Sequence, residues 1–72
     1  MSEVERLETA IGHVRKGELL RAAELLEQSD GAMTRENAEN CRRLAAAPNA
    51  YLEQALVYCL EQELGSARTF GF

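Results

Sequence analysis

The chain has 72 residues, of which 46% are hydrophobic and 28% are charged, so it is a single domain too apolar to be disordered. Its formal net charge of -4 argues against the basic surface by which proteins bind nucleic acid. No apolar run approaches the roughly 18 residues of a membrane span. Acids also stand near the N-terminus, where a signal peptide carries bases. We therefore expect a cytoplasmic protein that binds neither nucleic acid nor membranes.

The first predicted helix covers residues 3–16. Ser2 and Glu5 match the capping box, in which the serine hydroxyl accepts from the Glu5 amide and the glutamate reaches back to the Ser2 amide. The apolar residues of the segment recur at spacings of three and four, and this face is the predicted core: Val4, Leu7, Ala10, Ile11 and Val14. Gly17 then decides whether the helix continues, because a glycine inside a helix costs about 1 kcal/mol relative to alanine.

The second predicted helix covers residues 18–28. Its apolar residues spread over a wide arc and Leu20 lies on the far side, which favours contact with more than one neighbour. The following segment, 29–34, is a predicted loop. Within it, Gly31 suits the positive φ of a helix stop, and Thr34 is the expected N-cap of the next helix.

The third helix is predicted over 35–46, with a narrow stripe of small and apolar groups: Ala38, Cys41, Leu44 and Ala45. Pro48 ends it, because the residue before a proline is pushed out of the α region, and Asn49 caps the last helix. That helix is predicted over 50–64, with Gly65 just past its end.

These segments predict an all-α fold, a small antiparallel bundle. It contains four helices, over 3–16, 18–28, 35–46 and 50–64, or three if the first two are continuous through Gly17. Residues 1–65 form the domain, and 66–72 are expected to be a short tail without an element of its own.

Two faces of the 50–64 segment are apolar. Packing against the preceding helix explains the first face, which comprises Leu52, Ala55, Leu56, Cys59 and Leu60. Tyr51 and Tyr58 lie on the other side, beside Gln54 and Gln62. Tyrosine offers a large contact area at low entropic cost, so this face and Leu20 are candidate partner-binding residues. The alternative is that the tyrosines fill the core periphery, over the tail or over the second helix.

The sequence contains no constellation typical of catalysis, metal binding or cofactor binding. His13 is expected to be an exposed bystander, since its local acids are ordinary surface glutamates. Cys41 and Cys59 would face each other in a hairpin around Pro48; two small buried thiols are the favoured interpretation, with a disulfide as the alternative. Three arginines, Arg35, Arg42 and Arg43, are expected to be solvated.

Part of the chain resembles a known repeat. The stretch AIGHVRKGELLRAAELLEQ is similar to one tetratricopeptide helix pair, with Ala10, Gly17, Ala22 and Leu26 at small or apolar consensus spacings. It departs from the consensus at Arg6, Thr9, His13 and Ser29, and no further repeats follow to make a solenoid. In size and helical-hairpin character the chain also resembles the small co-chaperones of type III secretion, which would imply a protein-binding role.

The sequence therefore predicts a small non-enzymatic protein-interaction module, an adaptor or chaperone-like subunit, without cofactors. Its partner would be another protein or a second copy of the chain, because a domain this small gains stability from assembly. The alternative is an acidic inhibitor or antitoxin-like protein, of mobile-element origin, that masks a basic nucleic-acid-binding surface on its target. Residues 44–65 support it, since they carry acids and no bases.

Overall fold

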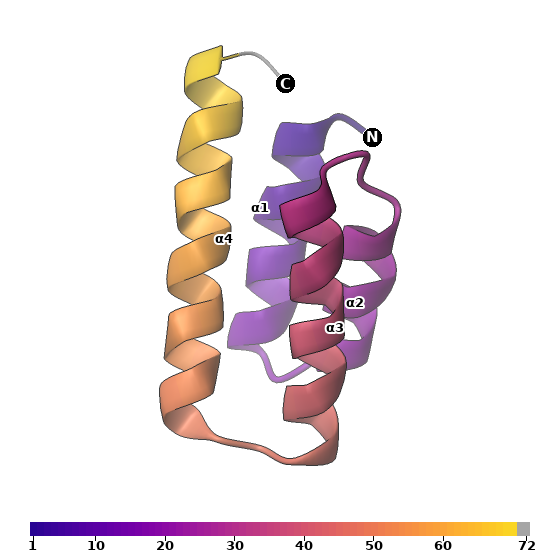
Figure 1. Ribbon diagram of the computed structural model, residues 1–72, viewed down its shortest axis with the longest axis vertical. Helices are drawn as coiled ribbons and strands as arrows, with labels where there is room; N and C mark the ends of the chain where they lie inside the picture. The colour runs from indigo at the N-terminus through magenta and orange to yellow at the C-terminus, as the bar shows by residue number, and fades with distance from the viewer. Residues whose placement is uncertain (71–72) are drawn as a thin grey trace.

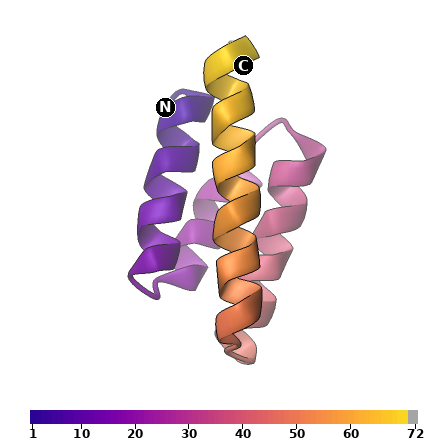
Figure 2. The same ribbon diagram turned by 90° about the vertical axis from the view of Figure 1, so that its left-hand side faces the viewer.

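The computed structural model describes residues 1–70 and contains four α-helices. They are α1 (Glu3–Arg15), α2 (Leu19–Glu27), α3 (Ala32–Ala46) and α4 (Ala50–Phe70). Successive helices run up and down, which confirms the predicted all-α bundle (Figure 1). α1 packs against α2 and α4, and α3 packs mainly against α2 (Figure 2).

The first helix begins where its sequence predicts, and its end decides the alternative that the sequence left open at Gly17. The Ser2 hydroxyl accepts a hydrogen bond from the Glu5 amide at 3.1 Å. At the other end, Gly17 has a φ of +79°. The Gly17 amide donates to the Val14 carbonyl at 3.0 Å and the Glu18 amide donates to the His13 carbonyl at 2.8 Å, which is a Schellman motif. Gly17 therefore separates α1 from α2, and the bundle has four helices.

The connection from α2 to α3 corrects two predictions. α3 begins at Ala32, with Gly31 as its N-cap at a φ of −77°, so Gly31 does not adopt a positive φ and Thr34 is not the cap. The cause is a turn at Ser29, whose hydroxyl accepts from the Gly31 amide at 3.0 Å. The Arg35 amide then donates to the Gly31 carbonyl at 3.1 Å, which places Thr34 in the first turn, where it is buried.

The start of α4 is confirmed, because Asn49 Oδ1 accepts from the Leu52 amide at 3.1 Å. Its predicted end near Leu64 is wrong: the helix continues through Gly65 to Phe70. Ala67 is buried and extends the core stripe by another turn, and Arg68 donates to Glu8 at 2.8 Å. Of the predicted tail, residues 66–70 are thus helical, and residues 71 and 72 lie outside the described residues.

One face of each helix supplies the core. The buried apolar residues are Leu7, Ala10, Ile11, Val14, Ala22, Ala23, Leu26, Ala38, Cys41, Leu44, Leu56, Leu60, Leu64 and Ala67. Leu52, Ala55 and Cys59, predicted for the core face of the last helix, are instead exposed, and so is Ala45 of α3. α4 packs more closely on α1 than on α3, which rotates its three residues, Leu52, Ala55 and Cys59, out of the core.

The two cysteines do not face each other inside a hairpin. Cys41 is fully buried, whereas Cys59 is exposed, and both thiols are free. The prediction of two buried thiols is therefore correct for Cys41 and wrong for Cys59.

Candidate protein-binding site

The side of α4 that points away from the core carries no charged side chain along almost the whole length of the helix. We call it the α4 outer face and define it by eight exposed residues within about 120° of arc at 100° per residue: Tyr51, Leu52, Ala55, Tyr58, Cys59, Gln62, Ser66 and Thr69. α4 has 21 residues and is therefore about 31 Å long at 1.5 Å per residue, which spans most of the molecule's 34 Å length. The core is filled from the opposite side of the same helix, at Leu56, Leu60 and Leu64.

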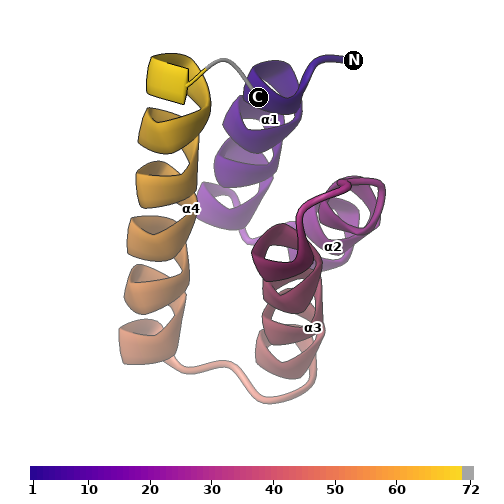
Figure 3. The same cartoon turned by 45° about the horizontal axis from the view of Figure 1, so that its top comes forward.

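The structure brings together some of the candidate residues and separates others. Tyr51 and Tyr58 are 85% and 63% exposed, so neither fills the core periphery. Gln62 shares their face. Gln54 lies at its edge, in a small hollow beside Arg15 and Val57. Leu20 is 60% exposed, but it belongs to α2, on the other side of the bundle from α4 (Figure 3).

A groove that the sequence did not predict lies beside the α4 outer face. Its volume is about 1070 Å³, and α3 and α4 form its two walls, with the start of α1 between them. Tyr58, Cys59, Gln62 and Ser66 line it from α4, and Met33, Glu36, Asn37 and Asn40 line it from α3. Figure 3 shows the two helices set apart at this end of the bundle. Met33, which is 71% exposed, is the residue that could have indicated the groove in the sequence. Because it fell in the predicted loop 29–34, the sequence did not show toward which helix its side chain points.

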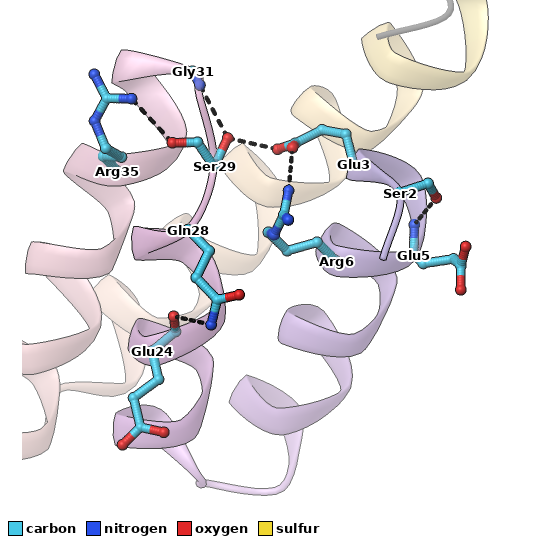
Figure 4. A network of polar contacts seen from close by, with 9 residues as sticks. All are labelled: Ser2, Glu3, Glu5, Arg6, Glu24, Gln28, Ser29, Gly31 and Arg35. Atoms are coloured by element: carbon cyan, nitrogen blue, oxygen red, sulfur yellow. Dashed lines mark hydrogen bonds and ion pairs between the residues drawn. The ribbon is translucent and has the colours of Figure 1, made fainter.

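A polar network fixes one end of the groove (Figure 4). The Ser29 hydroxyl donates to Glu3 Oε1 at 2.7 Å, and Arg6 donates to Glu3 Oε2 at 2.6 Å. Arg35 donates to the Ser29 carbonyl at 3.0 Å. These bonds tie the first turn of α1 to the α2–α3 connection, and they are part-buried, since Ser29 at their centre is buried.

Glu63 is the side chain of the groove whose pKa its surroundings shift. Burial raises its pKa above the ordinary value of 4.5, and the negative charge of Glu3 acts in the same direction. Hydrogen bonds from Asn37, whose amide donates to Glu63 Oε1 at 3.3 Å, and from Thr34 offset part of the rise. The folded state therefore binds a proton at Glu63 more readily than the unfolded chain does.

This shift predicts a pH-dependent difference between the wild type and Glu63→Gln. Because the folded pKa is raised, the stability that Glu63 contributes is fully present below the unfolded value near 4.5 and is lost as pH rises through the folded pKa. Glutamine does not titrate. The free energy of unfolding of the wild type relative to Glu63→Gln should thus fall as pH rises from about 4 to 7, as measured by urea titration. A difference that is constant across this range would contradict the raised pKa.

His13 is not the exposed bystander that the sequence predicted. It is partly buried, and its Nδ1 lies 2.8 Å from Glu18 Oε1. This hydrogen bond lowers the pKa of Glu18. The sequence did not indicate the pair because the turn at Gly17 brings Glu18 back to the end of α1. The pair joins α1 to the start of α2, which is a structural role.

Other charged groups also have partners within the chain. Arg42, predicted to be solvated, forms an ion pair with Glu27. Arg15 pairs with Glu61 at 3.1 Å. Since Glu61 and Glu63 both have contacts inside the molecule, less of the acidity of α4 is available to an outside partner than the sequence indicated.

Within residues 1–70, no group of three or more His, Cys, Asp or Glu side chains could hold a metal ion. None of the four described helices has the length and apolar character needed to cross a membrane. Comparison of the chain with protein-family models, curated proteins and solved structures gave no match.

Proposed function

We propose that this chain is a small non-enzymatic protein-binding module of the cytoplasm, an adaptor or chaperone-like subunit that binds its partner through the α4 outer face. The observation that carries the proposal is the exposure of Tyr51 and Tyr58 on a helix side without charges. Large apolar side chains gathered on one exposed face often mark a protein-binding surface. Tyrosine is enriched among the residues that dominate binding energy, because its ring buries a large area and its hydroxyl can remain hydrated.

The double variant Tyr51→Ala, Tyr58→Ala tests this function. Both side chains are largely outside the core, so the helix content and melting temperature should change little. Binding to proteins that co-purify with the untagged wild type, identified by mass spectrometry, should weaken at least tenfold. Leu20→Ala separates the two candidate surfaces, because Leu20 is similarly exposed but lies on α2; if the α4 outer face is the binding surface, this variant should bind as the wild type does. Unchanged binding by the tyrosine variant would contradict the proposal.

Salt titration of the same complex separates this function from that of an acidic inhibitor. Contacts made by tyrosine and leucine should change little between low and high salt. Binding to a basic nucleic-acid-binding surface should weaken steeply, because salt screens exposed charges.

A further inference from the structure

The groove beside the α4 outer face has the shape of a docking site for one more helix. Figure 3 shows its two walls, α3 and α4, set apart from each other. On α4 the lining runs from Tyr58 to Ala67, which is about 13 Å at 1.5 Å per residue, or two to three helical turns. Amphipathic helices of partner proteins commonly bind in grooves of this kind, with their apolar side turned inward.

Both walls offer apolar side chains to such a helix. Met33 of α3 is 71% exposed and Tyr58 of α4 is 63% exposed, and both line the groove. Cys59, also exposed, lies beside Tyr58 in the same lining. Methionine adapts its shape to a partner, and tyrosine contributes a large contact area. These residues would contact the apolar side of a bound helix.

The charge of the groove is negative. Four acidic side chains line it: Glu3, Asp30, Glu36 and Glu63. The guanidinium of Arg6 is already bonded to Glu3 at 2.6 Å, and even with the amino group of Met1 counted, the acids outnumber the basic groups. Asp30 and Glu36 are exposed and form no ion pair with another residue of 1–70. Charge complementarity therefore favours a basic occupant and opposes an acidic one.

Glu63 gives a second reason for a basic occupant. Burial and the negative charge of Glu3 both raise the pKa of Glu63, so a positive charge brought into the groove would stabilise its ionised form. Within residues 1–70, the acids do not form a group that could hold a metal ion. A lysine or arginine side chain of a partner can supply the positive charge.

The apolar and acidic groups are unevenly distributed along the groove. Asn37 donates to Glu63 at 3.3 Å, and this bond joins the antiparallel walls at one level. Tyr58 and Asn40 lie on one side of that level, where no acid lines the groove. The four acids lie at that level or on its other side, toward the α2–α3 connection. A bound helix would thus place a large apolar residue near Tyr58 and its basic residues one to two turns away.

We infer that the groove between α3 and α4 binds a basic amphipathic helix of a partner protein, whose apolar side contacts Tyr58 and Met33 and whose lysine or arginine side chains face Glu36 and Asp30. The inference rests on the proposed function, because Tyr58 and Cys59 belong to the α4 outer face, and it specifies the chemistry of the partner.

A displayed library tests this chemistry. One face of a stable helical hairpin is randomised, and the library is selected for binding to the full chain. Selected helices should combine a large apolar residue with lysine or arginine one to two turns away, or about three to seven residues along the helix. Selection of acidic or uncharged helices, or of none, would overturn the inference.

Charge reversal tests the place of binding. The double variant Asp30→Lys, Glu36→Lys should weaken binding of a selected helix at least tenfold, as measured by fluorescence anisotropy, because repulsion replaces attraction. The matched control is Glu24→Lys, Glu39→Lys, which changes the net charge equally at two exposed residues outside the groove. It should change the dissociation constant by less than about threefold, since distant charges are screened. Equal weakening by the two variants would contradict binding in the groove.

Circular dichroism checks that both variants fold. If Asp30→Lys disturbs the turn before α3, Glu36→Lys and Glu39→Lys give the same comparison within one helix, because Glu36 lines the groove and Glu39 does not.

Salt gives an independent readout. Exposed ion pairs are weak and screened, so binding of the selected helix should fall by about two- to fivefold between low and high salt. This is much less than the steep loss expected for a basic nucleic-acid-binding surface. The neutral variant Asp30→Asn, Glu36→Gln should remove most of the salt effect. A salt effect that this variant retains would arise elsewhere and contradict the inference.

Nuclear magnetic resonance locates the bound helix. The amide signals of Met33, Asn37, Cys59 and Ser66 should shift when the selected helix is added, whereas that of Leu20 on α2 should not. Concentrating the chain alone should leave these signals unchanged. If they moved, a second copy of the chain would occupy the groove, which would overturn the inference.

Failure of this inference is distinguishable from failure of the proposed function. If the tyrosine double variant loses the co-purifying partner while Asp30→Lys, Glu36→Lys retains it, the proposed function stands and the inference is overturned. If both variants retain the partner, both proposals are overturned.

Discussion

Leu60→Ala should destabilise the domain by about 2–5 kcal/mol, the usual cost of removing a large buried aliphatic side chain and leaving a cavity. Leu60 is 0% exposed and lies in the middle of the α4 core stripe, between Leu56 and Leu64. A domain of 72 residues has a free energy of unfolding of about 4–11 kcal/mol. The variant should therefore lose a large share of its stability, and a fraction of it should be unfolded at 37 °C. Urea titration followed by circular dichroism measures the loss.

Leu52→Ala is the control for this experiment because it makes the same chemical change in the same helix. Leu52 is 57% exposed, so its truncation should cost less than about 1 kcal/mol in dilute protein. The comparison also tests the rotation of α4 about its axis. The sequence pattern assigned both leucines to the core, whereas the structure buries Leu60 alone. Equal losses in the two variants would contradict the structure.

The elements that could be predicted from the sequence are those whose cause is local. The N-cap at Ser2 and the cap at Asn49 each depend on a few neighbouring residues, and the structure confirms both. At Gly17 the sequence left open whether the helix stops or continues, and the structure shows a stop. Gly31 and Gly65 were misinterpreted because a glycine is compatible with several conformations. At Gly31 the Ser29 hydroxyl makes the turn by accepting from the Gly31 amide, and the same hydroxyl is held from α1 by its bond to Glu3. At Gly65 the burial of Ala67, one turn further on, favours continuation of the helix.

The candidate site was predictable only in part for a related reason. The sequence indicates the tyrosines as candidates because, on a helical wheel, they lie on a different side of the helix from Leu56 and Leu60. Two apolar arcs overlap on α4, however, and the sequence does not show which arc meets the core. That choice depends on whether α1 or α3 is the closer neighbour, which is a tertiary property. The groove exists because α3 lies farther from α4 than α1 does, which is also a tertiary property. No pattern in the sequence therefore predicts it.

Gly17→Ala should destabilise the domain by about 1–2 kcal/mol. Gly17 has a φ of +79°, in the left-handed region where a Cβ crowds the following carbonyl oxygen. Nothing lies within 4 Å of the Cβ that alanine would add, so the expected cost comes from the backbone and not from a clash. If the chain escaped the strain by leaving this conformation, it would lose the bonds to the His13 and Val14 carbonyls that end α1.

Gly12→Ala gives the opposite expectation from the same chemical change. Gly12 lies inside α1 with ordinary helical backbone and open space around its added Cβ, so alanine should stabilise the domain by about 0.5–1 kcal/mol. Thermal unfolding of the two variants beside the wild type should therefore give a lower melting temperature for Gly17→Ala and a higher one for Gly12→Ala. If Gly17→Ala were also stabilising, α1 and α2 would be one continuous helix, because only a helical backbone at position 17 would make alanine favourable there. The sign of this single substitution thus decides between three helices and four in solution.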